Sequence, residues 1–429
     1  MDLDAVLLSE IAPSEVRKGC SFRAGPDDEQ WFLDSRRDNR PTLTSQCWWE
    51  LPPSADPQVL EVALREVVAG HDILSSRFEY RDDQVWCIPG EHPPEILRVT
   101  ESGPEWASTG FVGGIDPLID PLVRCLVGIG DTRSRFGIEL SHATVDGWAW
   151  DLLVDELSQV YNRILAGNNV TLNRSPQLGD WADRQWRRIG NDDALIRRWA
   201  DYLESAGIRP PDIEIDTSNH SGSLTWSVSM ESWKTLQTVA SRLRCTPTIL
   251  LLGLLGWSAV WVHGDARAVR VPSLNRDLPG STEIIGNLSS QLLVPFAGDG
   301  FHSVKAAVSC ARSGLLSGAD LSPMSFDRAA RSLWSDEQVS QLHCWAPFLA
   351  VEAQTSSGDE CGPAGGQVIL ECSPPDAQPG AEIAVVAGKQ ELLISANWRG
   401  MPLKEAQRFI DVAEQFVGRI ERVDVSRHD

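Results

Sequence analysis

The chain has 429 residues, enough for one large domain or two of ordinary size, and we expect two lobes. Its composition, 42% hydrophobic and 23% charged, is typical of a globular protein and excludes wholesale disorder. Lys and Arg number 38 against 60 Asp and Glu, which gives a net charge of −22. Such a charge repels a phosphate backbone, so nucleic acid is not expected as a partner.

The N-terminus and the cysteines indicate the cellular compartment. The first residues, Met-Asp-Leu-Asp-Ala-Val, lack the basic and apolar regions of a secretory signal. Nine cysteines with no Cys-x-x-Cys pair fit reduced thiols better than a disulfide framework or a zinc site. We therefore expect a cytoplasmic protein with no metal site and no redox chemistry.

The first half of the chain alternates helical and strand-like patterns, which predicts an α/β or α+β fold. An apolar stripe predicts a helix over 57–70, followed by a strand over 84–88. Two more strands are predicted over 122–128 and 135–140. A loop then leads into a helix that starts after Gly147 and ends near residue 167.

The polar stretch 168–179 has no apolar period and is the predicted boundary between the lobes. We place an N-terminal lobe at 1–174 and a C-terminal lobe at 175–429. The second lobe is predicted to contain helices over 181–203, a buried helix over 247–262, a strand over 268–272, an exposed loop over 355–381, a strand over 391–397 and a last helix over 403–423. The charge-free run at 245–264 is too short and too broken by glycine to span a membrane, so no membrane partner is expected.

The segment Glu139-Leu-Ser-His-Ala-Thr-Val-Asp-Gly-Trp carries the best candidate for chemistry. The chain lacks a Gly-x-Ser-x-Gly elbow, a phosphate-binding loop, a His-Glu-x-x-His motif and a Rossmann fingerprint. His142 follows a strand, where an imidazole can take a proton from an attacking amine or hydroxyl. Gly147 would let a substrate approach the backbone closely. On spacing alone, a lone loop histidine is more often packed or solvated than catalytic.

Residues 141–147, Ser-His-Ala-Thr-Val-Asp-Gly, resemble the His-His-x-x-x-Asp-Gly signature of condensation domains from nonribosomal peptide synthetases. Upstream, Gly70-His-Asp-Ile-Leu-Ser-Ser-Arg-Phe is similar to the family's Arg-His-x-x-Leu-Arg-Thr-x-Phe segment. Downstream, Asn275-Arg276 and then Ile285-Gly-Asn-Leu-Ser-Ser-Gln resemble its Gly-Arg and Gly-x-x-x-Asn-Thr stretches. These weak motifs occur in the family's order over about residues 28–421.

The resemblance implies two chloramphenicol acetyltransferase-like lobes in a V-shaped pseudo-dimer, with the active site in the tunnel between them. It implies that an acyl or aminoacyl thioester on the phosphopantetheine of a carrier protein is joined to an amine, with an alcohol as the alternative acceptor. His142 matches the catalytic histidine. Asp146 and Arg276 match an architectural salt bridge, and Gly147 would help to hold an oxyanion at a helix N-terminus.

The chain also departs from the family's pattern. Ser141 stands in place of the first histidine, Ser75 replaces an arginine, and Ser290 occupies the usual asparagine position. Trp148 and Ser290 are candidates for lining the tunnel, although tryptophans at the start of an amphipathic helix are more often core. These departures leave open a catalytically degenerate scaffold that recruits a carrier or tailoring enzyme, or an acyltransferase that uses coenzyme A.

The expected partner is an acyl or peptidyl carrier protein acting in trans, because no carrier or adenylation segment is visible in the chain. Carrier proteins are commonly acidic, so docking on this acidic chain needs a local basic patch. The helical region after the lobe boundary offers Arg184, Arg187, Arg188, Arg197 and Arg198. The alternative is a solvated helix face whose arginines pair with neighbouring aspartates. We expect no bound cofactor and a monomer, and the donor and acceptor are not readable from sequence.

Overall fold

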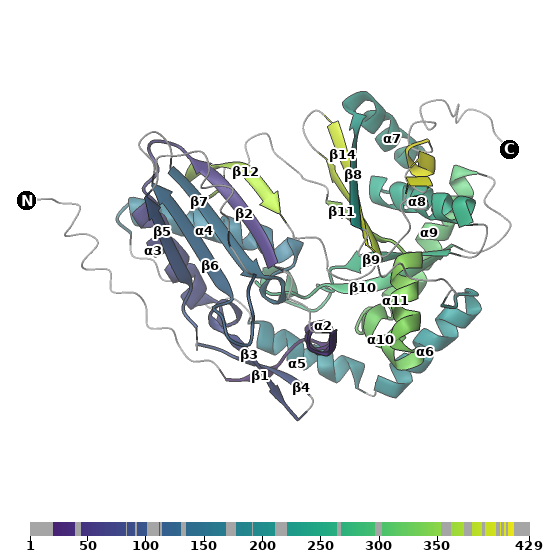
Figure 1. Cartoon of the computed structure of the whole chain (residues 1–429), viewed down its shortest axis with the longest axis horizontal. Helices are drawn as coiled ribbons and strands as arrows, with labels where there is room; N and C mark the ends of the chain where they lie inside the picture. The colour runs from purple at the N-terminus through teal and green to yellow at the C-terminus, as the bar shows by residue number, and fades with distance from the viewer. Residues whose placement is uncertain are drawn as a thin grey trace, which may run out of the picture. The chain divides into compact units, whose positions relative to one another are not determined.

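The protein is described from a computed structural model (Figure 1). The described residues are 20–38, 44–82, 84–90, 92–100, 111, 114–129, 134–168, 177–190, 192–210, 221–263, 267–296, 303–352, 362–372, 380–387, 391–399, 404, 407–408 and 411–415.

The chain forms two compact units, each built from three stretches of sequence. Unit 1 comprises Met1–Arg188, Arg276–Leu288 and Asp359–Pro374. Unit 2 comprises Ile189–Asn275, Ser289–Gly358 and Pro375–Asp429. Two short segments from the second half of the sequence therefore return to unit 1. The predicted lobe boundary at residue 174 lies outside the described residues.

Unit 1 is built on a five-stranded sheet in the order β12-β2-β7-β6-β5 (Figure 1). Its strands are β2 (Thr44–Leu51), β5 (Glu95–Thr100), β6 (Val123–Ile129), β7 (Ser134–Ser141) and β12 (Gln367–Cys372). The β5–β6 pair is parallel, and the other neighbours in this sheet run antiparallel. A smaller sheet, β1-β4-β3, contains β1 (Phe22–Arg23), β3 (Arg77–Arg81) and β4 (Gln84–Ile88) and lies beside α2 (Pro26–Asp38).

Helices α3 (Pro57–Gly70) and α4 (Gly147–Leu165) cover one face of the larger sheet. The apolar stripe of α3 and the inward residues Phe136, Ile138 and Leu140 of β7 belong to one buried cluster. Asp56 caps α3 by accepting bonds from the backbone N–H groups of Gln58 and Val59. The predicted helix over 57–70 and the predicted strands around β4, β6 and β7 are confirmed.

Unit 2 is built on a six-stranded sheet in the order β10-β9-β11-β13-β14-β8. Its strands are β8 (Ser221–Ser229), β9 (Arg267–Ser273), β10 (Ser290–Phe296), β11 (Phe348–Glu352), β13 (Gly380–Ala387) and β14 (Glu391–Arg399). Its helices are α6 (Asp192–Ser205), α7 (Met230–Arg242), α8 (Pro247–His263), α9 (Val304–Ala319), α10 (Phe326–Leu333) and α11 (Asp336–Trp345), while α5 (Leu178–Ile189) runs almost wholly in unit 1. The predicted buried helix is confirmed as α8, in which Leu250–Leu252, Leu254 and Leu255 are buried.

The expectation of an exposed loop over 355–381 is wrong for its described central part. Residues 367–372 form β12, which pairs with β2 at the edge of the unit 1 sheet. The glycine-rich run before it forms the short 3-10 helix η5 (Pro363–Gly365). Composition predicted a loop because glycine and proline break regular structure, whereas pairing with a distant strand supplied the missing backbone hydrogen bonds. The predicted helix at 403–423 lies mostly outside the described residues.

Gly362 gives a direct test of how η5 docks. A Cβ atom at this position would stand 2.1 Å from both Cδ1 and Nε1 of Trp49, whose side chain is buried. We expect Gly362→Ala to destabilise the protein by about 1–3 kcal/mol, measured by urea denaturation, because the added methyl group would overlap the buried indole and force the two apart. Gly318→Ala in α9 is the control, since its Cβ would meet nothing closer than 3.8 Å. Equal stabilities for the two variants would contradict this docking.

In the part of the chain that the structure describes, no single helix is both long and apolar enough to cross a membrane. One helix pair, Met230–Arg242 with Pro247–Val262, passes that test by length and composition, with a bend of 96° between its members.

Candidate active site

The site is built where β7 ends and α4 begins. Ser141 closes β7, and its backbone N–H donates to the Leu122 carbonyl. His142 opens the 3-10 turn η3 (His142–Thr144), in which the Thr144 hydroxyl donates to the Ser141 carbonyl at 2.6 Å. The turn is therefore pinned at both ends, and it holds the half-buried His142 at a fixed place after the strand.

Asp146 is the N-cap of α4. One of its carboxylate oxygens, Oδ1, accepts the backbone N–H of Ala149 at 2.8 Å, and Asp146 has the extended backbone that an N-cap requires. Gly147 is the first residue of the helix and is exposed. The space beside Gly147 is open, because a Cβ atom added there would meet no neighbouring atom within 4 Å among the described residues.

The structure brings Asp146 and Arg276 together as a buried ion pair. Nη2 of Arg276 lies 2.7 Å from Oδ1 and 2.9 Å from Oδ2 of Asp146, and the side chains of Arg276 and Asp146 are 4% and 3% exposed. Burial lowers the pKa of the Arg276 guanidinium, and the Asp146 carboxylate opposes that shift. Because each charge lies out of water, each depends on the other for compensation.

Arg276 also organises the segment that follows it. Nη1 donates to the carbonyls of Ser281 and Ile284, and Nη2 donates to the carbonyl of Gly286 at 3.1 Å. At the far end of the segment, the backbone N–H of Leu288 donates to Oδ2 of Asp146 at 2.9 Å. The backbone of Arg276–Leu288 thus surrounds the Arg276 guanidinium, and it is hydrogen-bonded to Asp146, the N-cap of α4.

A second buried carboxyl, Asp28 in α2, holds the same segment and was missed by the sequence analysis. Its Oδ1 accepts a hydrogen bond from Nδ2 of Asn287 at 2.8 Å, and Asp28 is 4% exposed. Burial raises the pKa of Asp28 well above its usual value, and the nearby carboxylates of Asp27 and Asp146 raise it further. Nothing in the acidic run at 27–29 pointed to a partner about 260 positions away.

Because its pKa is raised, ionised Asp28 lowers the free energy of unfolding at neutral pH, and the variant Asp28→Asn should remove this destabilisation. Below about pH 3 this carboxyl is protonated in both folded and unfolded chains, so it does not change the stability. As the pH rises the unfolded chain ionises first, and wild-type stability falls until the pH passes the folded pKa. We expect the stability of Asp28→Asn relative to wild type to grow between pH 4 and pH 8 in urea titrations. A difference that stays constant with pH would contradict the assignment.

Two other residues predicted for the site are tied into the structure by hydrogen bonds. Trp148 is 41% exposed, and its indole Nε1 donates to the Thr282 carbonyl at 3.0 Å. Ser290 belongs to unit 2, is 3% exposed, and donates its hydroxyl to the Ser322 carbonyl. Their role as lining residues stays a prediction.

Two further histidines in the described regions, His71 and His343, lie in structural pairs. His71 Nε2 lies 2.8 Å from Glu156 Oε2, and His343 Nε2 lies 2.8 Å from Asp327 Oδ1; both histidines are 3% exposed. The Asp327 carboxyl, despite its burial, has its pKa lowered to about 2 by His343, Arg270 and Arg331. Both imidazoles are therefore held by carboxylates in the interior.

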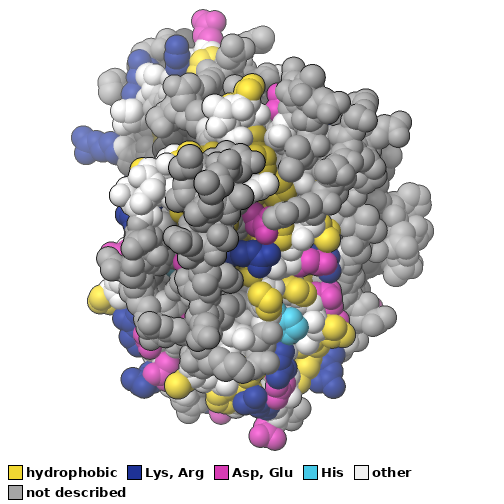
Figure 2. Space-filling view, turned by 90° about the vertical axis from the view of Figure 1, so that its left-hand side faces the viewer, with side chains coloured by type: hydrophobic (Ala, Val, Ile, Leu, Met, Phe, Trp, Pro, Cys, Tyr) yellow, Lys and Arg dark blue, Asp and Glu magenta, His cyan; other side chains and the backbone are white. Residues whose placement is uncertain are grey.

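Several arginines of the predicted basic patch already form ion pairs or hydrogen bonds with other residues. Arg187 pairs with Asp183, Arg188 lies 2.7 Å from Asp277, and Arg184 donates to the Pro279 carbonyl. These contacts favour the interpretation of a paired helix face over a free docking patch. On the face shown in Figure 2, the described basic and acidic side chains lie interspersed among hydrophobic ones.

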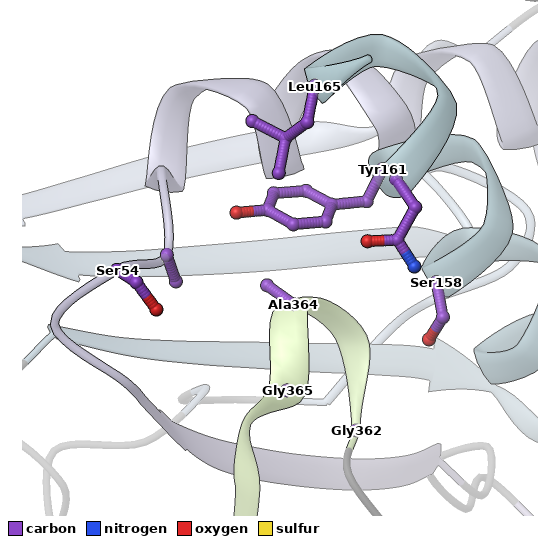
Figure 3. A pocket seen from close by; sticks show the side chains of 9 residues that line it. Ser54, Ser158, Tyr161, Leu165, Gly362, Ala364 and Gly365 are labelled. Carbon is purple, nitrogen blue, oxygen red and sulfur yellow. The ribbon is translucent and has the colours of Figure 1, made fainter.

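A pocket of about 420 Å³ lies at the other end of α4 (Figure 3). Its wall combines Tyr161 and Leu165 of α4 with Ser54 and with Ala364 of η5. Tyr161 lies 14 residues beyond Gly147, about 21 Å along the helix axis, so this pocket is separate from the loop that carries His142. Among the described residues, no group of three His, Cys, Asp or Glu side chains is arranged to hold a metal ion.

The sequence model of the condensation domain matches residues 28–292, which is more than half of the chain. Among curated proteins, nonribosomal peptide synthetase agiA of Aspergillus flavus is 23% identical over 77% of this chain, and cyclosporin synthetase simA of Tolypocladium inflatum is 25% identical over 66%. The matched part is only 4% of the first relative's length and 2% of the second's.

Solved structures of condensation domains share the fold. The condensation domain from the monacolin K polyketide synthase MokA aligns with a TM-score of 0.78 at 12% identity, covering 94% of this chain and 98% of that one. The nonribosomal peptide synthetase condensation enzyme VibH aligns with a TM-score of 0.73 at 16% identity, covering 92% and 96%. The mixed helix-and-sheet structure in two units is thus the chloramphenicol acetyltransferase-like fold of these proteins. With the motif order, the matched family model and the fold in agreement, this chain belongs to the condensation-domain family.

Proposed function

We propose that this protein is an acyltransferase that joins an acyl or aminoacyl thioester, held on the phosphopantetheine of a carrier protein, to an amine. The observation that carries the proposal is the pinned turn that presents His142 directly before a helix whose cap, Asp146, is fixed by Arg276. A histidine held in this way at a strand end is suited to proton transfer at neutral pH. Membership of the condensation-domain family supports the same reaction class.

In the proposed step, the acceptor nitrogen attacks the thioester carbonyl carbon. The C–N bond forms and the C–S bond breaks, so the products are an amide and the free thiol of the carrier. His142 takes the proton that the amine loses and returns it to the leaving thiolate, which balances the charge. Holding the amine and stabilising the tetrahedral intermediate is an equivalent role for the same imidazole. An alcohol acceptor would give an ester by the same steps.

The start of α4 suits the developing oxyanion. Backbone N–H groups at a helix N-terminus carry partial positive charge, and Gly147 has open space beside it. Glycine leaves that space free for a substrate carbonyl to approach the backbone. The Asp146–Arg276 pair contributes by fixing the direction of this helix start rather than by touching the substrate.

The proposal is tested by intact-mass spectrometry of acyl-loaded carrier proteins, supplied as separate chains with candidate amines and alcohols. Loss of the acyl mass from the carrier together with a new amide or ester, dependent on His142, supports the proposal and identifies the donor. Acyl groups that stay on every carrier, under conditions where each carrier is shown to be loaded, overturn it for that panel.

The departure at Ser141 favours one second candidate, a scaffold that binds a carrier protein without transferring the acyl group. This candidate predicts carrier binding in a pull-down with no change in acyl mass, and no effect of His142→Ala. A coenzyme A-dependent acyltransferase is distinguished in the same assay, because acyl-coenzyme A then gives saturable product formation without any carrier.

A further inference from the structure

Three helices of unit 2 carry a local excess of positive charge. Lys and Arg occur five times and Asp and Glu once over residues 230–263 and 303–319, whereas acidic residues outnumber basic ones 60 to 38 in the whole chain. These two ranges form α7, the turn after it, α8 and α9. Four of the five basic residues are exposed, and Arg312 is half-buried. We call this surface the α7–α9 patch, and it consists of Lys234, Arg242, Arg244, Lys305 and Arg312.

Hydrogen bonds at the end of α7 hold the centre of the α7–α9 patch together. Nη2 of Arg312, in α9, donates to the backbone carbonyls of Leu243 at 3.3 Å and Arg244 at 2.8 Å. These carbonyls follow the last turn of α7, where the helix dipole is negative and a guanidinium is favourable. Arg244 and its neighbour Arg242 therefore lie close to Arg312, and Lys305 lies two turns before Arg312 on the same side of α9.

The positive charge of the α7–α9 patch is not compensated within the described part of the chain. Among the described residues, no carboxylate forms an ion pair with any of its five basic side chains. On α5, by contrast, Arg187 pairs with Asp183 and Arg188 pairs with Asp277. Because a compensated charge attracts a further anion less strongly, the α7–α9 patch is better suited than α5 to an acidic partner.

An exposed leucine adds an apolar contact to the α7–α9 patch. Leu316 lies one turn beyond Arg312 on the same side of α9 and is 70% exposed. A leucine beside arginines gives a partner protein both an apolar group to bury and positive charge to pair with. A nucleic acid backbone gains little from the leucine, so the combination favours a protein.

We propose that the α7–α9 patch is the docking surface for the acidic carrier protein that supplies the acyl group. The inference rests on the proposed function for the identity of this partner. An acidic carrier is repelled by the net charge of −22 on the chain as a whole and attracted by this local positive region, which orients it as it approaches. The patch thus meets the need for a basic surface that the paired arginines of α5 do not meet.

The first measurement is the affinity of the full chain for the carrier in its apo form, determined by calorimetry at low salt. The apo form lacks the phosphopantetheine arm, so only contacts between the two protein surfaces contribute. Arg242→Glu with Arg244→Glu should weaken binding about tenfold to a hundredfold, because two attractions become repulsions. Leu316→Ser should weaken it about threefold to tenfold. Arg312 is left unchanged because its bonds hold the end of α7.

The matched control is Arg197→Glu with Arg198→Glu, which changes the net charge by the same amount. Both arginines are exposed and belong to α6, a helix with four acidic and two basic residues. This control should keep the wild-type affinity for the apo carrier. Added salt should weaken binding by wild type, since exposed charges are screened.

The second measurement compares acyl transfer from the loaded carrier with transfer from a small soluble donor, the N-acetylcysteamine thioester of the same acyl group. With the carrier as donor, Arg242→Glu with Arg244→Glu should lower kcat/KM by about the factor by which it weakens binding. With the small thioester the same variant should match wild type, because that donor has no protein surface to dock.

The docking surface is overturned if the reversal of Arg242 and Arg244 leaves the affinity for the apo carrier unchanged, or if the α6 control weakens it equally. It is also overturned if a DNA duplex binds wild type more tightly than the carrier and depends on the same two arginines. Failure of the proposed function looks different, because acyl transfer would be absent with every donor while binding of the apo carrier kept its dependence on the patch.

Discussion

Arg276→Ala should destabilise the protein by about 3–5 kcal/mol, the largest stability effect expected here. The substitution leaves the Asp146 carboxylate, 3% exposed, without its compensating charge. It also removes the donor that binds the carbonyls of Ser281, Ile284 and Gly286. Urea denaturation gives the loss directly, and a fall in soluble yield would accompany it.

The matched control for Arg276→Ala is Arg188→Ala. Arg188 pairs with Asp277 in the same segment, but the two side chains are 33% and 54% exposed, so its loss should cost less than about 1 kcal/mol. Arg276→Lys should recover only part of the loss, because an ammonium cannot reproduce the planar fork that reaches several acceptors. An effect of Arg276→Ala as small as that of Arg188→Ala would contradict the buried pair.

The double variant Asp146→Asn with Arg276→Met separates the contribution of the ion pair to stability from that of the other hydrogen bonds that Arg276 donates. Removing both charges together should cost less than the sum of the two single substitutions, because no uncompensated charge is then left inside. Asn at 146 can still cap α4, so the remaining loss reports mainly on the three carbonyls that Arg276 binds.

His142→Ala should lower the rate of acyl transfer about 10²- to 10⁴-fold, the usual range for a positioned acid or base. The melting temperature should change little, because the side chain is only half-buried. Rates are measured by mass spectrometry of the carrier at saturating acceptor, with the carrier and donor that support turnover by wild type.

The control for His142→Ala is His71→Ala, in which an interior histidine bonded to Glu156 is removed. That variant should lose stability, and any loss of rate should follow its unfolded fraction. A His142→Ala variant that keeps the wild-type rate would show that the imidazole does not transfer the proton. That result would favour the scaffold alternative.

Short-range patterns determined the elements of the fold. The apolar stripe over 57–70 predicted α3, and alternation over 135–140 predicted β7, because burial of one face needs that spacing in any context. The Ser-His-x-x-x-Asp-Gly run was enough to locate the turn with His142 and the start of α4. Order of motifs along the chain was enough to identify the condensation-domain family, which the matching family model then confirmed.

Only the tertiary structure decided which distant segments complete unit 1. Residues 276–288 and 359–374 return to it from the second half of the sequence, and the latter contributes β12, where composition had predicted a loop. The hydrogen bond between Asp28 and Asn287 could not be predicted from the sequence either. The physical reason is shared: residue type and spacing fix local geometry, whereas hydrogen bonds and charge compensation depend on which groups folding brings together in the absence of water.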